Sequence, residues 1–432
     1  MSKDGGNYLA YQPDSFNPIA FSLLTYRRPG TENTLLLFPS PPDVGLNTLE
    51  ELVAATGASE PRESEIGRAF SLLAAQSARV FINDTEASRG IAVPFVEAAY
   101  PSAAIFNSGT GGWTSAKVQA ALATVDRSNV FRALEDIPGQ EAAGIVVESP
   151  NALASAARVV EGVTERAVLA SSISPACMAI TEAKVSEILE SPSEVFEAAA
   201  VTTPNRQFVL RPYSGLNAGQ REILIDGIFA DGRVLFASFS EKRRVDPDPP
   251  YMDRRITTLA DMHNVPVSLF TDVIVRVFDR IGVRNTVFHA EFAMTTAGPL
   301  MTDLLARPGG GFIPEMVRAR FGVDLRAAHV YAAFEMVSEL RRIAGLGLDS
   351  GLHVAIAACY IDEGNRTKYA AGAALTERLS RSEDVIAYNI ETVATNVAIG
   401  LPDVRACLAV RGETPDSALA ELDSIATEFG FS

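Results

Sequence analysis

The chain has 432 residues, of which 47% are hydrophobic and 21% are charged, a balance typical of a soluble globular protein with two or three domains. Its net charge is −16, because 37 Lys and Arg residues are outnumbered by 53 Asp and Glu residues. Such an acidic chain offers no general basic surface to a nucleic acid or an anionic membrane, although a local positive pocket for a nucleotide is compatible with it.

Cysteine usage and the start of the chain favour a cytoplasmic protein. Cys177, Cys359 and Cys407 are odd in number and far apart, and no C-x-x-C or His/Cys metal-binding spacing occurs, so we expect reduced, buried thiols. The opening sequence MSKDGGNYLAYQPDSF has no apolar stretch after its lysine, and we expect no secretory signal. No apolar run approaches the roughly 20 residues that a membrane helix needs.

Strands and helices alternate through the first 120 residues. The hydrophobic pattern predicts strands at 34–40, 79–84 and 102–107, and helices at 46–57 and 64–78. This alternation favours a parallel sheet covered by helices. The loop SGTGGWTS, residues 108–115, either cradles a phosphate or forms a simple turn, and it lacks the Lys-Ser/Thr ending of a P-loop.

The middle of the chain mixes both kinds of element. We predict helices at 152–160, 191–200 and 266–282, the last ending near Gly282, and a strand-rich segment at 206–242. The Pro- and charge-rich stretch 243–258 reads as a loop.

The segment FHAEFAMTTAGPLMTDLLARPGGGFIP, residues 288–314, carries the chemistry. Glu291 and Asp303 are separated by a spacing that lets a hairpin bring two carboxylates side by side, which suits a hard cation such as Mg²⁺. Arg307 can fork onto a phosphate or a carboxylate. The run of Gly309, Gly310 and Gly311 allows a close backbone approach and offers N–H groups to an anion.

His289 precedes Glu291 by two residues, so both side chains are expected on the same face of the strand. From that position His289 either orients the carboxylate, contacts a substrate or is purely structural. The other three histidines show no partner pattern and are expected to be structural.

Two helices are predicted before residue 350, and residues 350–432 are predicted to form a small α+β lobe. A helix is expected to begin at 315 and a longer one to span 329–345. Strands follow at 353–361, 385–390 and 405–412, and a helix at 415–429 closes the chain.

The 288–314 stretch resembles the metal-binding hairpin of the ATP-grasp superfamily, in particular of the carboxylate–amine ligases that join amino acids. The family pattern is roughly F-H-x-E-F, a short turn, then E-x-N-x-R-P-G-G-G, and here it reads FHAEF and DLLARPGGG. Residues 221–242 are similar to the family's segment of two strands around a turn, with matches at Glu222, Ile225, Asp226 and Lys242. The resemblance covers roughly residues 120–432.

The resemblance implies a mixed α/β (α+β) fold of three parts. These are an N-terminal Rossmann-like parallel-sheet domain at 1–120, a small central α+β subdomain at 121–205, and a C-terminal antiparallel-sheet domain at 206–432. In the third part, residues 350–432 would form a terminal α+β lobe.

The resemblance also assigns roles. Glu291 and Asp303 would hold Mg²⁺, and Glu222 and Lys242 would bind ATP. Arg307 would be catalytic, steadying the transferring phosphoryl group. A substrate carboxylate would be bound by the glycine loop together with His289, the loop residues being Gly309, Gly310 and Gly311.

Several positions depart from the family pattern. Leu305 stands where an Asn or another oxygen donor is usual, and Arg211 stands where a Glu normally faces the adenine and ribose. The strand expected to supply a phosphate-binding lysine, within 165–174, has none, and Lys184 is the nearest. Asp126-Arg127 stands where an Asn/Asp-Lys pair is usual, and Asp303 replaces a Glu.

Three hypotheses follow. The first is an ATP-dependent carboxylate–amine ligase acting on amino acids in specialised metabolism through an acyl phosphate. The second is a degenerate relative whose ATP chemistry is weakened, lost or repurposed, and the third is a non-catalytic partner of an active ligase. We expect small-molecule acid and amine substrates, no nucleic-acid or membrane partner, and a homodimer as the default assembly. No motif reports which acid or amine is used.

Overall fold

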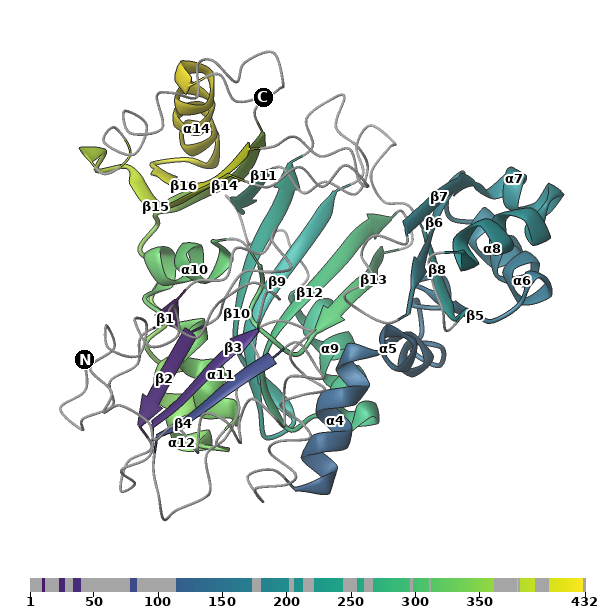
Figure 1. Cartoon of the computed structure of the whole chain (residues 1–432), viewed down its shortest axis with the longest axis horizontal. Helices are drawn as coiled ribbons and strands as arrows, with labels where there is room; N and C mark the ends of the chain where they lie inside the picture. The colour runs from purple at the N-terminus through teal and green to yellow at the C-terminus, as the bar shows by residue number, and fades with distance from the viewer. Residues whose placement is uncertain are drawn as a thin grey trace.

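The computed structural model describes most of the chain from residue 114 onward and four strands before it. The described ranges are 10–11, 23–27, 34–39, 78–83, 114–172, 180–201, 206–212, 221–243, 255–259, 267–295, 298–310, 312–333, 335–360, 379, 381–392 and 404–429. They form three sheets with helices packed against two of them (Figure 1).

The N-terminal strands form one antiparallel sheet. It has the order β1 (Ala10–Tyr11), β2 (Leu23–Arg27), β3 (Thr34–Pro39) and β4 (Ala78–Asn83). β3 and β4 confirm two predicted strands, but the predicted parallel pairing is wrong for these strands, because each neighbouring pair is antiparallel. The hydrophobic pattern did not predict β2. Only residues 28–33 connect β2 to β3, and this connection is too short for the crossover that a parallel pair of strands requires. The helix at 46–57, nearly all of the helix at 64–78 and the strand at 102–107 lie outside the described residues.

A second, four-stranded antiparallel sheet has the order β5 (Ile145–Val147), β8 (Phe208–Pro212), β6 (Arg166–Ser171) and β7 (Ile180–Lys184). It packs against α6 (Pro150–Glu161), α7 (Val185–Glu190) and α8 (Pro192–Ala200). We call this sheet with its three helices the central lobe. α6 and α8 confirm two predicted helices. β8, which the predicted boundary assigned to the C-terminal part at 206–432, pairs here with β5 and β6.

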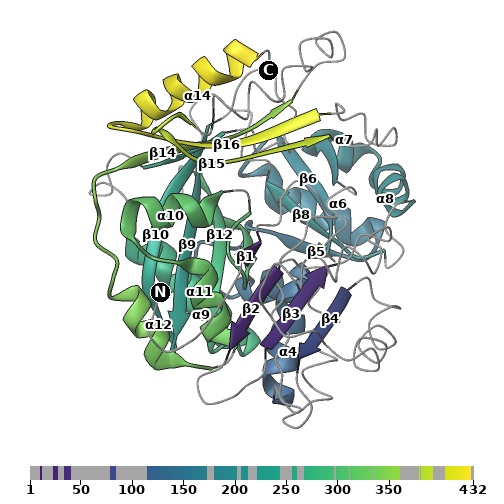
Figure 2. The same cartoon turned by 60° about the vertical axis from the view of Figure 1, so that its left-hand side comes forward.

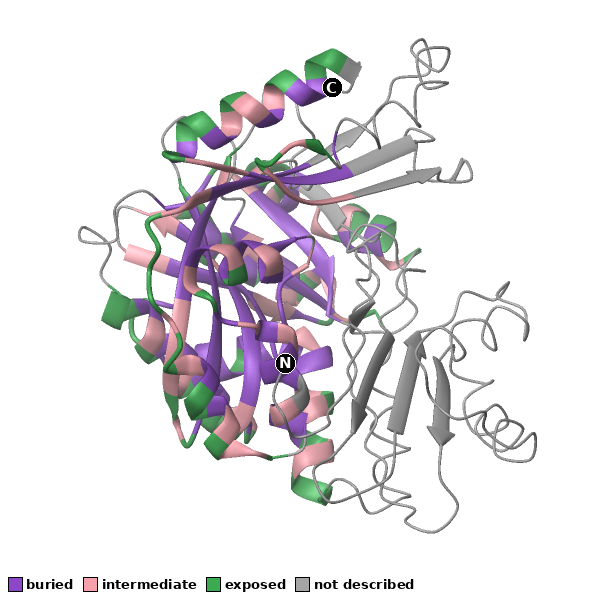
Figure 3. Ribbon diagram, turned by 90° about the vertical axis from the view of Figure 1, so that its left-hand side faces the viewer, coloured by how far each residue is buried: buried purple, intermediate pink, exposed green. Residues whose placement is uncertain are grey.

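The largest sheet has eight strands in the order β13-β12-β9-β10-β11-β14-β16-β15. The strands are β9 (Glu222–Ala230), β10 (Arg233–Arg243), β11 (Arg255–Thr258), β12 (Asn285–Thr295), β13 (Gly298–Leu305), β14 (His353–Tyr360), β15 (Val385–Thr392) and β16 (Val404–Gly412). All of its pairs are antiparallel, as predicted for the C-terminal part. Figure 3 shows how much of this sheet is buried.

Helices cover both faces of the large sheet. α9 (Val267–Ile281) packs on one face, and α10 (Ile313–Phe321), α11 (Leu325–Ala333) and α12 (Val337–Ala344) pack on the other (Figure 2). α14 (Pro415–Phe429) covers β14 and β16. α5 (Arg127–Leu134) lies between the large sheet and the central lobe, and α4 (Ser115–Val125) packs against α5, α9 and β13 (Figure 1).

Two predicted elements differ from the structure. The single helix predicted at 329–345 is two helices, α11 and α12, because Glu335 between them has a backbone φ of 58° that no α-helix accepts. The loop predicted at 243–258 ends in the strand β11, whose hydroxyl-rich sequence RITT pairs with β10 and β14. The strands and the helix predicted after residue 350 are confirmed as β14, β15, β16 and α14.

Strand alternation in β9 and β12 separates two different environments. On the face toward α9 the side chains are apolar, and they form a core with that helix through Ile223, Ile225, Phe229, Phe288, Ala290 and Phe292. On the opposite face one end is apolar and packs on α10–α12 through Ile228 and Val287, and Leu224, which lies between Glu222 and Asp226, joins the same core. The other end of that face carries charged side chains, and these form the candidate site.

Candidate functional site

The β12–β13 hairpin places Glu291 directly opposite Asp303 in the strand register. Antiparallel partners of this kind have their Cβ atoms about 5 Å apart, so the two carboxylates are neighbours as the spacing predicts. The register shifts immediately beyond this pair, where Phe292 faces Met301 and Thr302 is an extra residue in β13. A β-bulge therefore interrupts the ladder next to Asp303.

The carboxylate of Glu291 belongs to a buried polar cluster. We define this cluster as Glu222 and Asp226 on β9, Lys242 on β10, and His289 and Glu291 on β12. The cluster therefore combines three carboxylates with one lysine and one histidine.

Lys242 lies at the centre of one half of the cluster. Its Nζ donates to Glu222 Oε1 at 2.9 Å and to Glu291 Oε2 at 2.9 Å. The Lys242 side chain is only 8% exposed, so both ion pairs lie largely out of water. Lys242 and Glu222 face each other in the register of β9 and β10. The structure thus brings Glu222 and Lys242, both assigned to ATP from the resemblance, to the first predicted metal ligand.

His289 holds the other half of the cluster. Its Nδ1 lies 3.0 and 3.1 Å from the two oxygens of Asp226, and its Nε2 lies 3.3 Å from Glu291 Oε1. Burial by itself lowers the pKa of His289, but the charges and hydrogen bonds of Asp226 and Glu291 outweigh it and raise that pKa to about 10. The shared strand face expected for His289 and Glu291 is present.

Glu291 is held strongly in its ionised form. Burial opposes its ionisation, but the positive charge of Lys242 and the hydrogen bond from His289 keep the pKa of its carboxyl well below the usual range. A carboxylate that stays charged at neutral pH is the form a divalent cation needs.

Asp303 is paired with a cation from another element. The guanidinium of Arg127, the first residue of α5, donates from Nε to Oδ1 at 3.0 Å and from Nη2 to Oδ2 at 2.8 Å. The exposed fractions of the two side chains are 13% and 9%, so this bidentate pair is nearly buried. The two predicted metal ligands are therefore each neutralised by a different protein cation.

Three further residues that bear on the departures from the family pattern have a definite place in the structure. Arg211 on β8 donates from Nη1 to the backbone oxygen of Thr302 at 2.6 Å, so it binds the bulge beside Asp303. Leu305, opposite His289 in the register, is buried with 5% exposure. Lys184 ends β7 as an exposed side chain 3.9 Å from Glu187.

The glycine loop does not present its first N–H to a ligand. The N–H of Gly309 donates to Asp226 Oδ1 at 3.0 Å inside the protein, so its expected role as an anion donor is not what this geometry shows. Gly310 accepts a backbone hydrogen bond from Ile313 at 3.4 Å, and Gly311 lies outside the described residues. Arg307 is half-buried and its Nη1 donates to the oxygen of Pro308 at 2.7 Å.

Arg127 and Asp226 were not singled out as site residues from the sequence. Arg127 was noted only for its place in the family pattern, and its partner lies 176 residues away, a distance no local pattern spans. Asp226 carried a local signal, because it stands four residues after Glu222 and so shares its strand face.

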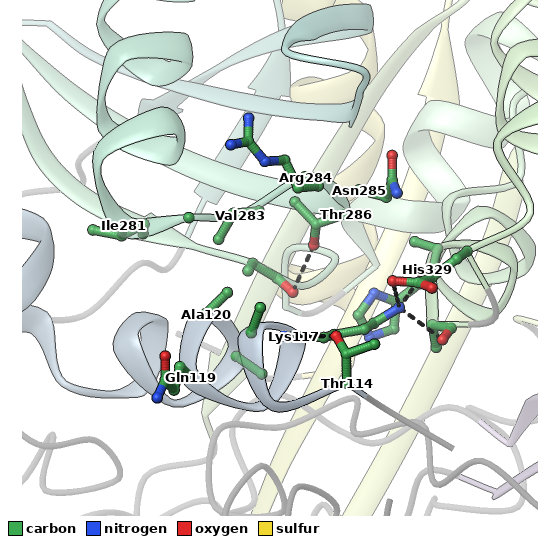
Figure 4. A pocket seen from close by; sticks show the side chains of 17 residues that line it. Thr114, Lys117, Gln119, Ala120, Ile281, Val283, Arg284, Asn285, Thr286 and His329 are labelled. Atoms are coloured by element: carbon green, nitrogen blue, oxygen red, sulfur yellow. Dashed lines mark hydrogen bonds and ion pairs between the residues drawn. The ribbon is translucent and has the colours of Figure 1, made fainter. Parts of the chain in front are cut away.

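A cavity of about 350 Å³ lies elsewhere, between α4, α11 and the start of β12 (Figure 4). Its lining combines small apolar residues with Lys117, Thr286, His329 and Glu335, and it contains none of the predicted site residues. Lys117 donates to the backbone oxygens of Ala332 and Ala333 at 2.8 Å each. Loss of hydration lowers the pKa of Lys117 to about 8, against the opposing charge of Glu335.

The described residues contain no group of three or more His, Cys, Asp or Glu side chains arranged to hold a metal ion. Within the same residues, no helix combines the length and the apolar character needed to span a bilayer.

Comparison with known proteins identifies the fold. No protein-family model matches the chain. Dapdiamide A synthase from Enterobacter agglomerans is 28% identical over 145 residues, which is 32% of this chain and 32% of that enzyme, so the match spans about a third of each. An L-amino acid ligase from Bacillus licheniformis superposes with a TM-score of 0.56 at 11% identity, covering 77% of this chain and 78% of that one. A phosphoribosylglycinamide synthetase from Anaerococcus prevotii gives a TM-score of 0.52 at 13% identity, covering 78% and 80%. The chain therefore shares its fold, the ATP-grasp fold, with the L-amino acid ligase and the phosphoribosylglycinamide synthetase.

Proposed function

We propose that the protein is an ATP-dependent ligase of specialised metabolism that joins an amino-acid carboxylate to an amine through an acyl phosphate. The observation that carries the proposal is the pairing of Glu291 with Asp303 on neighbouring strands. Arg307 follows Asp303 by four residues. The fold shared with an L-amino acid ligase supports it, as does the partial match to Dapdiamide A synthase.

The donor set fits Mg²⁺. Glu291 and Asp303 supply carboxylate oxygens, and this ion commonly completes its shell with water and substrate phosphates rather than with further protein ligands. Each carboxylate already faces a cation, Lys242 or Arg127, so the positions around them favour positive charge. Leu305 offers no oxygen, and we therefore propose one protein-held Mg²⁺.

The side chains would share the work as follows. Glu291 and Asp303 would hold Mg²⁺, which when bound neutralises charge on the transferring phosphoryl group. Lys242 and Arg127, released from these carboxylates, would keep two positive charges beside the phosphates. Arg307 would steady the phosphoryl group and the tetrahedral intermediate.

The proposed reaction has two steps, phosphorylation of the carboxylate and attack by the amine. An oxygen of the substrate carboxylate attacks the terminal phosphorus of ATP, the bond to the bridging oxygen breaks, and ADP leaves. The amine nitrogen then attacks the acyl carbon and loses a proton, and phosphate leaves with the electrons of the acyl C–O bond. The products are an amide, ADP and phosphate.

The direct test supplies the protein with ATP, Mg²⁺ and pairs of amino acids. We expect ADP release and a product whose mass equals the two amino acids minus one water. Glu291→Gln is the matched control, because it keeps the size of the side chain and removes the charge that would hold Mg²⁺. Titration calorimetry with ATP and Mg²⁺ should show a Kd of micromolar to millimolar order. Absence of heat together with absence of ADP would remove the proposal.

A second candidate is an ATP-grasp homologue that has lost ATP chemistry and serves as a partner of an active ligase. Specific positions favour it: Arg211 is committed to the Thr302 carbonyl, Leu305 replaces an oxygen donor, and β6 carries no lysine. Calorimetry separates the two candidates, because this one predicts no ATP binding. Co-purification with a second ligase chain would support it, and turnover by the isolated chain would exclude it.

A further inference from the structure

Asp226 is one of the most deeply buried charged residues described in the chain, with 1% of its surface exposed. It lies in the middle of β9, between β12 and β10, and faces His289 across one pair of strands and Ser238 across the other. A carboxylate in such a place is tolerated only when its oxygens are fully hydrogen-bonded. Its partners therefore indicate what it does.

The oxygens of Asp226 connect two parts of the candidate site. Oδ1 accepts the N–H of Gly309 at 3.0 Å, and both oxygens lie within 3.1 Å of His289 Nδ1. The other ring nitrogen of His289 faces Glu291. Since carboxylates only accept, the ring donates from both nitrogens, and its plane is fixed between Asp226 and Glu291.

The start of the glycine loop is packed tightly against this pair. A Cβ atom at Gly309 would lie 2.5 Å from Asp226 Oδ1 and 2.8 Å from His289 Nδ1. Only glycine fits there, so the loop backbone, Asp226 and His289 form one close-packed unit. A displacement of the loop must therefore move the carboxylate or the ring.

We infer that Asp226 is a positioning residue, which anchors the glycine loop at Gly309 and, through His289, orients the Glu291 carboxylate. Its hydrogen bonds go to His289 and to the N–H of Gly309, and not to Glu291 itself. Asp226 therefore connects the loop that follows Arg307 to the carboxylate proposed to hold Mg²⁺ through one hydrogen-bond network. The inference rests on the proposed function for the role of Glu291 as a metal ligand.

The link between loop and carboxylate can be tested without turnover. Hydrogen exchange of the peptide covering Gly309 should be about tenfold faster in Asp226→Asn than in the native protein, because a charged acceptor of the buried amide becomes neutral. Glu291→Gln, which does not touch Gly309, should also speed this exchange by at least about twofold, since the network is cooperative.

Asp349→Asn is the matched control. Asp349 likewise accepts from a cationic side chain, Arg320, and from a glycine N–H, that of Gly351, but it lies outside the polar cluster. This variant should leave exchange at Gly309 unchanged. If Asp226→Asn does not fold, His289→Gln removes the next link and should also speed the exchange.

Kinetics test the positioning role itself. Asp226→Asn should raise the Mg²⁺ concentration for half-maximal ADP release by about ten- to a hundredfold, the usual effect of losing an outer support of a metal site. The KM for ATP at saturating Mg²⁺ should change much less, whereas a merely structural defect would leave the Mg²⁺ requirement unchanged.

The outcomes separate the inference from the proposed function. If the native protein releases no ADP, the ligase proposal fails, while hydrogen exchange still decides whether Asp226 connects the loop to Glu291. Unchanged exchange at Gly309 in Asp226→Asn overturns the inference. Faster exchange in Asp226→Asn but not in Glu291→Gln overturns the link to the carboxylate.

Discussion

The two faces of β9 and β12 are built from alternating residues of the same strands, yet they follow different rules. Toward α9, neighbouring residues such as Phe288 and Phe292 are fully buried in an apolar core. On the reverse face, His289 is also buried and the side chain of Glu291 is 17% exposed, and both lie among charges. One face gains its stability from area removed from water. On the other face, burying charged groups costs desolvation energy, as expected where such groups form a binding or catalytic site.

Arg307→Ala tests the chemical half of this comparison and should have the largest effect. If the polar end of the face serves phosphoryl transfer, the variant should lose about a hundred- to a thousandfold in kcat, because a charge aimed at the developing anion is removed. Its unfolding midpoint in urea should change much less than its kcat, since the side chain is only half-buried. An unaffected turnover rate would take Arg307 out of the mechanism.

Phe288→Ala tests the apolar half. Phe288 is fully buried and its ring lies 5.9 Å from that of Phe278 in an edge arrangement. We expect a loss of about 3–5 kcal/mol in the free energy of unfolding, from lost transfer energy plus a cavity. Urea denaturation measures it, and the folded fraction should keep its ATP affinity. A loss below about 1 kcal/mol would mean that this core is not what holds the sheet.

Lys242→Met probes whether the polar end also contributes to stability. The substitution leaves Glu222 and Glu291 buried without their shared cation, and we expect a cost of about 3 kcal/mol in unfolding free energy. Lys184→Met, at an exposed lysine 3.9 Å from Glu187, is the comparison and should cost under about 0.5 kcal/mol. Equal effects of the two variants would show that the cluster contributes no more than a surface pair.

Lys117, which lies outside both faces, should make the unfolding free energy depend on pH. Its pKa is about 8 in the folded protein against 10.5 in a model peptide, so the unfolded chain binds more protons between these values. Stability therefore rises with pH in this window as the desolvated charge is released. The difference in unfolding free energy between the native protein and Lys117→Met should increase by up to about 3 kcal/mol from pH 7 to pH 10.5. A pH-independent difference would contradict the lowered pKa.

The sequence predicted the parts of the fold that local patterns determine. Alternation and spacing along residues 285–305 are enough to define a hairpin and its facing carboxylates, and β14–β16 with α14 were found for the same reason. Strand direction in the first 83 residues was predicted wrongly, because a strand does not encode the direction of its partner. The break between α11 and α12 depends on one residue with positive φ, which periodicity does not report.

The candidate site divides in the same way. His289, Glu291 and Asp303 come from one short motif, whereas the pairing of the two carboxylates with Lys242 and Arg127 could not be predicted from it. Lys242 lies 49 residues from Glu291, and Arg127 lies 176 residues from Asp303. Such pairs exist only after the sheet and the central lobe have been brought together, so their energies are properties of the tertiary structure.

The outer edge of the large sheet has a consequence for assembly. β13 is an edge strand, and its outward backbone groups are already engaged: Gln140 donates to the oxygen of Pro299 and accepts the N–H of Met301, and Arg211 takes the oxygen of Thr302. An exposed edge invites strand addition by another chain. Because side chains from β8 and from the segment between α5 and β5 occupy it here, growth of the sheet into ribbons or aggregates along this border is blocked for as long as these segments stay docked.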